Sequence, residues 1–441
     1  MLKIGAELLD VSDGSRLVVV SKLGRGGQGD VWSVRAQSDV EPVAVKWYHP
    51  ASATPEQFHR ISELVDSGEP NERFLWPRSL VTSPEDPTGF GYVMPIRPHG
   101  YDRFDSVLDG RSGQLTFVTL ATIGRNLAVS FHALHAAGLC YRDINIANVF
   151  VQPNDGEILV CDNDNVSIDG DDSGVRGSMY FMAPEVMRGD SNPSRHSDYF
   201  SLAVLLFYLL VRHHPLEGRR CLEGIWDDAA QMRAFALEPV FIFDPDDASN
   251  APDGAHQLVP LDWWPLLPGY VRDLFTRSFT VGLTDPQARV TETVWRDALD
   301  DLRASVQHCT CGAANLRDPQ ASEQLCWRPM CRAPLAELPT MIPARPRGRR
   351  PLVLDDGATL THVNTTKMTK PDHRVTVARV EVRPDQAADP GLRNVSSLAW
   401  TFHPASGGAP VAVAPGRVLR LRSGTLDFGA GHSVRLVMPK T

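Results

Sequence analysis

Three residues near the middle of the chain have the types and the spacing that phosphoryl transfer requires. They are Asp143, Asn148 and Asp162, and a short apolar stretch precedes the last of them. The reaction needs one carboxylate to orient the attacking hydroxyl group, and oxygen ligands to hold Mg²⁺ or Mn²⁺ against the nucleotide phosphates. We therefore expect Asp143 to orient the hydroxyl, and Asn148 and Asp162 to bind the metal. This interpretation requires a glycine-rich loop and a strand lysine earlier in the chain.

A glycine-rich loop stands near the N-terminus. Gly24, Gly26 and Gly29 follow the pattern GxGxxG, and Val31 comes shortly after them. Because glycines lack β-carbons, the backbone of such a loop can approach phosphates closely. A glycine-rich hairpin turn that binds nothing is the alternative interpretation of this segment.

The strand lysine is Lys46, which ends the run Val-Ala-Val-Lys over residues 43–46. Its ammonium group can pair with the α- and β-phosphates of a nucleotide, whereas a solvated strand lysine is the alternative. An acid that holds Lys46 is expected from the next helix, predicted over residues 55–67. Glu63 is preferred over Glu56, and an exposed glutamate is the alternative for that position.

The elements that would position these residues can be predicted from hydrophobic periodicity. Residues 15–48 alternate apolar and polar positions, which indicates strands joined by a tight loop. Residues 116–137 have helical spacing, and 198–212 is apolar on all sides, as in a buried helix. Helical patterning returns over 270–306, and we place a domain boundary near residue 306.

Taken in order, these motifs resemble those of bacterial eukaryotic-type (Hanks-type) Ser/Thr protein kinases over roughly residues 15–305. The resemblance implies that Asp143 is the base of the HRDxxxxN motif, and that Asn148 and Asp162 are its metal ligands. The run Ala183–Glu185 matches the APE motif letter for letter, and Arg289 stands where the partner of that glutamate is expected.

The same resemblance implies an α+β, bilobal kinase fold, with an N-lobe over about 15–96 and a C-lobe over about 97–305. Asp198 matches the acid that braces the catalytic loop. The implied cofactors are ATP and Mg²⁺ or Mn²⁺, and the implied partners are protein substrates. The residues implied to contact the nucleotide are Gly24, Gly26, Gly29, Val31, Ala44, Lys46, Glu63, Met94 and Ile96.

Four positions depart from the kinase pattern. Tyr141 replaces a histidine, Asn145 a lysine, Asn163 a phenylalanine and Asp164 a glycine. Loss of the lysine removes a cation near the γ-phosphate, and loss of the glycine removes a flexible backbone position. Asp164 could add oxygen ligands around a metal, or lie in a solvated loop. Two hypotheses follow: an active Ser/Thr kinase, or a catalytically impaired pseudokinase that binds nucleotide and acts as a scaffold.

Arg142, which precedes Asp143, implies regulation by phosphorylation of the following loop. The candidate sites are Ser167, Ser173 and Ser178, and we expect autophosphorylation at Ser173 or Ser178.

Composition excludes some function classes. The 441 residues carry a formal net charge of −9, which does not favour a nucleic-acid partner. The N-terminal segment has no apolar signal core, and the longest apolar run, 199–211, is too short to span a bilayer. We expect a soluble cytoplasmic protein without a membrane partner.

Four of the seven cysteines form a cluster after the kinase-like region. Cys309, Cys311, Cys326 and Cys331 supply two close pairs of thiols, the ligand set of a structural Zn²⁺ site. His308 offers a substitute ligand, and unpaired reduced cysteines are the alternative. We predict a zinc ribbon over residues 306–337.

The remaining chain is predicted as a linker and a small β domain. Residues 338–351 are rich in proline and arginine, which favours an extended connector. Residues 352–441 alternate apolar and polar positions between turn residues, which favours a β-sandwich. This tail, with its segments 391–396 and 421–429, resembles the second half of a forkhead-associated (FHA) β-sandwich. The Arg, Ser and His that read phosphothreonine in that family are not placed by the sequence, and a plain β-sandwich interaction module is the alternative.

The whole arrangement is similar to bacterial kinases of tellurium-resistance-type gene clusters. That resemblance, at the level of architecture, implies a stress response setting, a PP2C-type phosphatase and a von Willebrand-type protein as partners.

Overall fold

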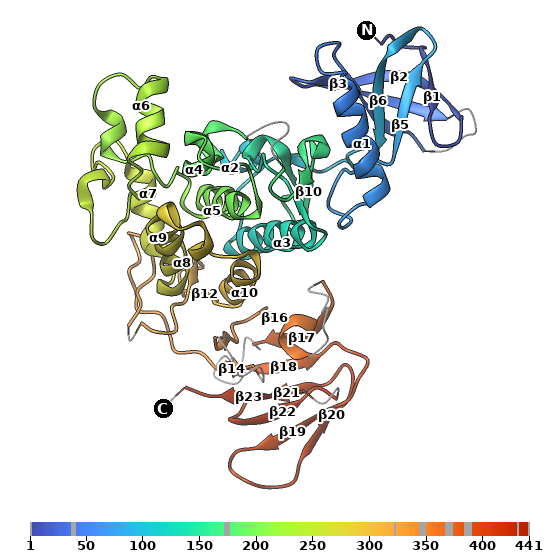
Figure 1. Cartoon of the computed structure of the whole chain (residues 1–441). Helices are drawn as coiled ribbons and strands as arrows, with labels where there is room; N and C mark the ends of the chain where they lie inside the picture. Colours follow the sequence, from blue (N-terminus) through green and yellow to red (C-terminus); the bar gives the residue numbers. More distant parts are fainter. Residues whose placement is uncertain are drawn as a thin grey trace. The chain divides into compact units, whose positions relative to one another are not determined.

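The computed structural model describes residues 2–36, 41–171, 177–321, 323–343, 350–366, 374–382, 390–429 and 432–439 (Figure 1). The chain divides into two compact units. The first comprises Met1–Leu115, Ile123–Leu261 and Leu274–Arg296, and the second comprises Thr116–Thr122, Asp262–Asp273 and Asp297–Thr441. The second unit therefore includes three segments of the predicted kinase-like region, namely 116–122, 262–273 and 297–305, and its last segment begins before the predicted boundary near 306. In the described part of the chain, no helix is both long enough and apolar enough to cross a bilayer.

The N-terminal part of the first unit is a closed six-stranded antiparallel barrel, in the order β1-β2-β3-β4-β6-β5. Alternation of apolar residues forms these strands, because every second side chain points into the barrel, where Leu8, Val34, Val45 and Val81 are fully buried. The strands are β1 (Glu7–Asp10), β2 (Arg16–Arg25), β3 (Gly29–Ala36), β4 (Val43–Tyr48), β5 (Ser79–Ser83) and β6 (Asp86–Met94). The barrel also includes β1, which lies before the predicted start near residue 15 and pairs with both β2 and β5.

Helix α1 (Pro55–Ser67) follows β4 over the range that the sequence predicts. Thr54 caps its N-terminus by accepting a hydrogen bond from the backbone N–H of Gln57, and Pro55 occupies the first turn, where a missing N–H costs nothing. Ile61 and Leu64 form its buried face.

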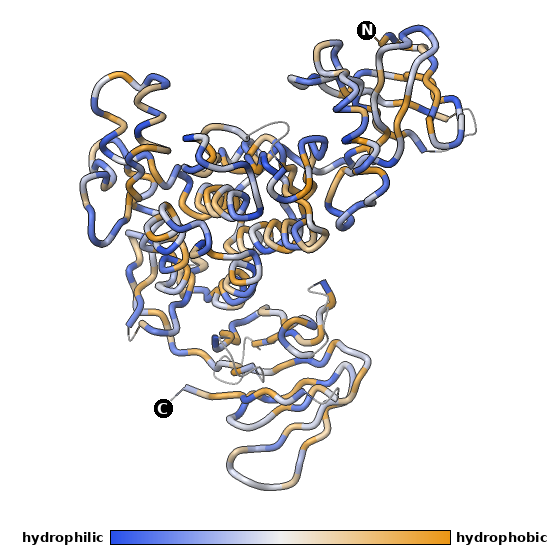
Figure 2. Tube along the Cα trace, in the orientation of Figure 1, coloured by the Kyte–Doolittle hydropathy of each residue, from blue (hydrophilic) through white to orange (hydrophobic). Residues whose placement is uncertain are grey.

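The remainder of the first unit is mainly helical around α5 (Arg195–Val211). Nearly every residue of α5 after its first turn is buried, and the helix appears as one of the most hydrophobic stretches of the tube in Figure 2. Phe207 of α5 contacts the rings of Phe241, Phe275 and Phe279, so aromatic packing fixes this helix in the core. The other α-helices between α1 and residue 305 are α2 (Phe104–Leu108), α3 (Phe117–Ala136), α4 (Pro184–Arg188), α6 (Asp228–Met232), α7 (Leu258–Trp263), α8 (Gly269–Phe279), α9 (Val281–Thr284) and α10 (Glu292–Arg303). Of these, α3, α7, α8 and α10 are divided between the two units.

Two small sheets accompany these helices, and all of their strands except β7 lie between α3 and α4 in the sequence. The first has the order β10-β9-β7 and the second pairs β11 with β8. Their strands are β7 (Asp102–Arg103), β8 (Leu139–Cys140), β9 (Val149–Val151), β10 (Ile158–Val160) and β11 (Ser167–Ile168).

The second unit contains a two-stranded hairpin of β12 (Val306–His308) and β13 (Ala314–Leu316), followed by two antiparallel sheets. One sheet has the order β15-β14-β23-β22-β19-β20 and the other β16-β17-β18-β21. Buried residues of both sheets, such as Met341, Val380, Leu392 and Trp400, form one core. The strands are β14 (Thr340–Ile342), β15 (Leu352–Val353), β16 (Thr359–Thr361), β17 (Thr376–Glu381), β18 (Gly391–Asn394), β19 (Trp400–Pro404), β20 (Val411–Val413), β21 (Val418–Arg420), β22 (Gly424–Asp427) and β23 (Ser433–Val437); helix α11 (His362–Thr365) follows β16.

The prediction of a linker over 338–351 was wrong at its N-terminal end. Residues 340–342 form β14, which pairs with both β15 and β23, and Met341 is fully buried. Three residues are too few for a periodic signal to emerge from a segment rich in proline and arginine. Residues 344–349 lie outside the described part of the chain.

Candidate functional site

A β-hairpin brings the two predicted metal ligands of the kinase-like region to neighbouring positions. Strands β9 and β10 are antiparallel, with Val149 opposite Val160, so Asn148 immediately precedes one strand and Cys161 immediately follows the other. The backbone N–H of Cys161 donates to the carbonyl of Asn148 at 3.0 Å. Asp162, the next residue, has a left-handed backbone (φ 52°) and a side chain that is 47% exposed. A carboxylate and an amide oxygen of this kind are the hard ligands that Mg²⁺ prefers.

Asp143 lies beside Asn148 and accepts hydrogen bonds on both carboxylate oxygens. The Asn148 amide donates to its Oδ2 at 3.3 Å, and the Ser178 hydroxyl donates to its Oδ1 at 2.7 Å. Asn145, the residue in place of lysine, donates from its amide to Ser178 Oγ at 3.2 Å. The hydroxyl of Ser178 thus contacts Asp143, the predicted base. Asn145, at the position where the kinase pattern has lysine, contacts the same hydroxyl with a neutral amide.

Lys46 is buried against two carboxylates of the segment after β10. Its Nζ lies 2.8 Å from Asp164 Oδ2 and 3.4 Å from Asp162 Oδ1. Burial lowers the pKa of Lys46, but the charges of Asp164 and Asp162 outweigh it, so the pKa stands above its ordinary value and the side chain is a cation. Tyr48 donates its hydroxyl to Asp164 Oδ2 at 2.7 Å.

The predicted acid on α1 does not hold Lys46. The side chain of Glu63 is 58% exposed and pairs with His59 one turn earlier, at 3.3 Å. The α1 residue that reaches the site is Gln57, whose amide donates to the hydroxyl of Tyr48 at 3.0 Å and to the carbonyl of Asp164 at 3.3 Å. The prediction was wrong because it required a charged residue on α1, whereas the helix presents an uncharged amide.

The predicted nucleotide-contacting residues of the barrel lie on β2, β3, β4 and β6, except that Gly26 lies between β2 and β3 and Ile96 lies after β6. Ala44 is opposite Met94 across β4 and β6, and both side chains are buried, whereas Val31 and Ile96 are half-buried. A β-carbon at Gly29 would overlap the carbonyl oxygen of Trp47, so this glycine is required by packing of β3 on β4. A β-carbon at Gly24 would meet nothing within 4 Å, so packing does not require a glycine at that position.

A buried acid braces the loop that carries Asp143. The backbone N–H groups of Tyr141 and Arg142 donate to Asp198 at 2.6 and 2.9 Å. The Tyr141 hydroxyl donates to the carbonyl of Cys161, the residue before Asp162. Tyrosine in place of histidine therefore still links the catalytic loop to the metal-binding segment.

His135 supports this brace from α3. It is buried between Asp198, at 2.9 Å from its Nε2, and Glu292, which contacts its Nδ1. Burial lowers the pKa of His135, but the two carboxylates outweigh this effect and raise it to about 9. Sequence reasoning missed His135 and Glu292, which lie 157 positions apart and belong to no motif.

We expect the first unit to lose stability in alkaline solution through this histidine. Because the folded pKa is about 9 and the ordinary value is 6.5, the stabilisation is complete below pH 6.5 and disappears as the pH rises through 9. The shift corresponds to roughly 3 kcal/mol as an upper bound. Urea unfolding between pH 6 and pH 10 measures it. Burial raises the pKa of Glu217 to about 7, so this group also titrates between pH 6 and pH 10. The His135→Gln variant separates the two groups. If it loses as much stability at alkaline pH as the wild type, the loss does not come from His135.

The predicted acid–arginine pair is present. Arg289 is 1% exposed and forms two hydrogen bonds of 2.7 Å with the carboxylate of Glu185. Its Nη1 also donates to the carbonyl of His196, its Nε donates to Gly282, and its guanidinium stacks near the ring of Phe200. The pair ties α4 to α5 and to the segment before α10.

Replacement of Arg289 by methionine is expected to destabilise the first unit by about 3–5 kcal/mol, because it leaves Glu185 without its partner in a partly buried site. The midpoint of urea unfolding measures the change. Arg111→Met is the matched control, since Arg111 pairs with Asp109 at 2.8 Å on the surface and should cost less than about 1 kcal/mol. Equal effects of the two substitutions would contradict the prediction.

Arg142, the predicted phosphate-responsive residue, is buried with a left-handed backbone (φ 73°), and its guanidinium donates to the carbonyl of Asp171. Burial lowers its pKa. Of the predicted phosphosites, Ser167 is buried in β11 and Ser178 contacts Asp143. Ser173 lies outside the described residues.

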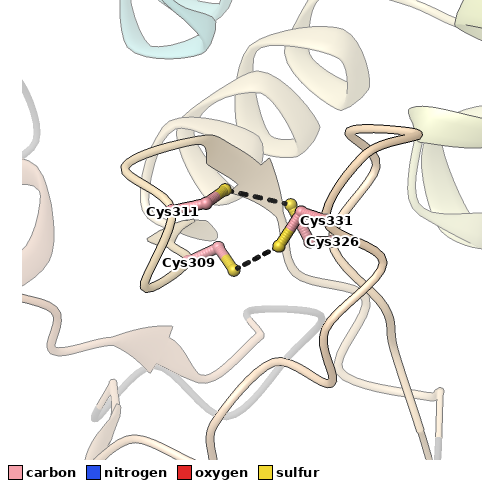
Figure 3. A group of neighbouring side chains, drawn as sticks. All are labelled: Cys309, Cys311, Cys326 and Cys331. Carbon is pink, nitrogen blue, oxygen red and sulfur yellow. Dashed lines mark hydrogen bonds between the residues drawn. The ribbon is translucent and has the colours of Figure 1, made fainter.

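The four clustered cysteines of the second unit converge on one point. Figure 3 shows Cys309 and Cys311, from the turn after β12, facing Cys326 and Cys331 from the following loop. All four sulfur atoms lie within 4.8 Å of one another, and the pairs Cys309–Cys331 and Cys311–Cys326 are each 3.7 Å apart. That separation is too long for a disulfide, and it is close to the sulfur–sulfur edge of about 3.8 Å in a tetrahedron with Zn–S bonds of 2.3 Å. The residues therefore fit zinc.

His308 is not part of this group. Its Nδ1 pairs with Asp355 at 2.8 Å, and the backbone N–H of His308 donates to the same carboxylate. The proposed substitution of a histidine for one thiol is therefore unnecessary.

A barrel that presents a buried lysine to a carboxylate–amide–carboxylate set is the arrangement of a phosphoryl-transfer site. Residues 17–260 match the family model described as protein kinase domain, and the chain belongs to that family. The chain is similar to protein kinase YegI of Escherichia coli O157:H7, with 24% identity over 313 residues, which are 67% of this chain and 46% of that protein. It is also similar to serine/threonine-protein kinase SAPK9 of Oryza sativa subsp. japonica, with 23% identity over 301 residues, 65% of this chain and 72% of the relative.

A shorter similarity is to the probable serine/threonine-protein kinase PknB of Corynebacterium glutamicum, with 28% identity over 141 residues, 30% of this chain and 21% of that protein. The chain spans about half the length of the YegI proteins that it matches.

Proposed function

We propose that this protein is an ATP-dependent Ser/Thr protein kinase. The observation that carries the proposal is the hydrogen bond of 2.7 Å from the Ser178 hydroxyl to Asp143, because it places a protein hydroxyl on the carboxylate that the reaction needs. The Ser/Thr specificity is supported by the similarity to the serine/threonine-protein kinase SAPK9 and the probable serine/threonine-protein kinase PknB.

In this proposal each residue has a defined role. Asp143 orients the acceptor hydroxyl, and Asn148 and Asp162 hold Mg²⁺, which neutralises charge on the phosphates when it is bound. Lys46 supplies a fixed cation for the nucleotide phosphates. Gly24, Gly26, Val31, Ala44, Met94 and Ile96 would surround the nucleotide, and Asn145 would position the acceptor without the charge of a lysine.

The test is transfer of label from γ-³²P-ATP to a generic protein substrate, with MgCl₂ and with EDTA. Label on serine and threonine that depends on the metal supports the proposal. If ATP raises the melting temperature but no label is transferred, the scaffold hypothesis is correct instead.

We also propose that the protein phosphorylates its own loop at Ser173 or Ser178. Support comes from the burial of Arg142 next to Asp143, where a phosphate on the loop would find a cation. Mass spectrometry after incubation with ATP should find phosphate between residues 167 and 178, and an unmodified loop would count against autophosphorylation.

For the second unit we propose a structural zinc ribbon over 306–337 and an FHA-like interaction domain after it. The convergence of four thiols supports the first. The core that buried side chains of the two antiparallel sheets form together supports a β-sandwich. An Arg and a Ser read phosphothreonine in FHA domains, and here Arg393 pairs with Glu381 and Ser396 bonds Asn394. A signalling or stress-response setting in the cytoplasm, with a PP2C-type phosphatase and a von Willebrand-type protein as partners, rests on the similarity of architecture.

A further inference from the structure

The carboxylate closest to Lys46 belongs to Asp164, in the segment after β10. Asp164 occupies the position that is glycine in the kinase pattern, and its carboxylate contacts Lys46 Nζ with both oxygens, at 2.8 and 3.0 Å. The side chain of Asp164 is completely buried and that of Lys46 is 5% exposed. A buried ion pair with two contacts fixes the position of the ammonium group, because moving either partner alone would leave a charge unpaired.

Asp164 is held in turn by other groups. Tyr48 donates its hydroxyl to Asp164 Oδ2 at 2.7 Å, and the amide of Gln57 donates to the carbonyl of Asp164 at 3.3 Å. These contacts leave the Asp164 carboxylate enclosed, whereas Asp162 two residues earlier is 47% exposed. The two acids of this segment therefore differ in position: Asp162 has one oxygen 3.4 Å from Lys46 but is half-exposed, so a metal can reach it, whereas Asp164 is enclosed against the lysine.

Helix α1 contributes no carboxylate to the contacts of Lys46 described above. Gln57 reaches Tyr48 and Asp164 with a neutral amide, and Glu63 pairs with His59 away from the site. In the kinase pattern an acid from this helix is expected to hold the lysine. Here the acid belongs to the segment that also carries the metal ligand, so the phosphate-binding cation and the metal ligand are fixed together.

We propose that Asp164 is the residue that positions Lys46 for the nucleotide phosphates, in place of a glutamate on α1. The inference rests on the proposed kinase function. Lys46 also lies 3.4 Å from Asp162 Oδ1, and without Asp164 that contact would be its nearest carboxylate and would tighten on the metal ligand. Asp164, with the shorter contacts of 2.8 and 3.0 Å, thereby keeps the cation in place and leaves the other oxygen of Asp162 available for Mg²⁺.

The experiment compares four variants of the full chain. Asp164→Asn removes the charge with little change of shape, and Gln57→Glu combined with Asp164→Asn moves the charge to α1. Glu63→Gln removes the acid that sequence spacing favours. Asp66→Asn is the matched control, because Asp66 is an exposed aspartate on the same helix. The measurements are kcat and KM for ATP, the Kd of Mg·ADP, and the melting temperature.

We expect Asp164→Asn to lower kcat/KM by about 10²-fold, with loss in kcat as well as a higher KM, since a misplaced lysine weakens phosphate contacts in the transition state. The variant with the charge moved to position 57 should recover at least about tenfold of that loss. Glu63→Gln and Asp66→Asn should match the wild type within about twofold.

Two results would overturn the inference. One is Asp164→Asn retaining wild-type kcat/KM and Mg·ADP affinity. The other is a loss that accompanies a lower melting temperature and is not recovered when the charge is moved, which would assign Asp164 to maintenance of the fold. If the wild type transfers no phosphate, the proposed function fails, and the Kd of Mg·ADP across the same variants still tests the position of Lys46.

Discussion

We expect Asp143→Asn to lower the rate of phosphoryl transfer by about 10³- to 10⁴-fold, while the variant stays folded and still binds ATP. The carboxylate of Asp143 accepts the Ser178 hydroxyl on one oxygen and the Asn148 amide on the other. An asparagine keeps the shape but has one acceptor oxygen and no basicity, so it can no longer take a proton from an acceptor hydroxyl. Its amide group would also face the amide of Asn148.

Initial rates with γ-³²P-ATP measure the effect, and the thermal shift caused by ATP measures nucleotide binding in the same samples. Asp246→Asn is the control, because Asp246 is an exposed aspartate of the same unit. Transfer by the Asp143 variant at more than a tenth of the wild-type rate would remove Asp143 from the role of base. A parallel loss of the thermal shift would instead indicate that the substitution damaged the nucleotide site.

The parts of the site that follow local spacing could be predicted from the sequence. Asp143 and Asn148 belong to one loop, and the short strands after Asn148 and before Asp162 make a hairpin that closes the gap between them. The structure gives α1 the predicted range because Thr54, Pro55 and the apolar positions of the helix all favour the same start and face.

The partner of Lys46 could not be predicted in this way. Asp164 is 118 positions from Lys46 in the sequence. The kinase pattern has glycine at this position, so it gives no indication of where an aspartate side chain would point. The inward direction follows from the backbone at Asp162 and from Asn163, which is buried and donates to the carbonyls of Leu75 and Val160. Such contacts depend on tertiary packing, which periodicity and motif spacing do not encode.

The substitutions that first suggested an inactive protein have contacts that preserve part of the usual arrangement. Tyr141 bonds the residue before Asp162, and Asn145 bonds Ser178. Asp164 supplies the charge that α1 lacks. Each of these three side chains therefore contacts a group of the candidate site. A chemical difference from the kinase pattern is the missing cation at position 145, whose absence we expect to lower kcat more than ATP affinity.

The cysteine cluster of the second unit should hold one Zn²⁺ per chain, and its removal should unfold the ribbon. Cys326 is fully buried and packs with Cys309, Ala313 and Leu335 in a core too small to be stable without a further cross-link. Four thiolates with sulfur–sulfur distances that suit a tetrahedron supply that link, and zinc in such sites contributes about 10–16 kcal/mol to folding.

Metal analysis of the purified protein and of Cys326→Ser measures this prediction, and hydrogen exchange over residues 306–337 reports folding of the ribbon. We expect the variant to lose the zinc and the protection of β12 and β13. Cys221→Ser is the matched control, since Cys221 is a half-buried thiol outside the cluster and should leave both readings unchanged. A wild-type protein with no zinc and a protected ribbon would contradict the assignment, because the small core would then be stable through its side-chain packing alone.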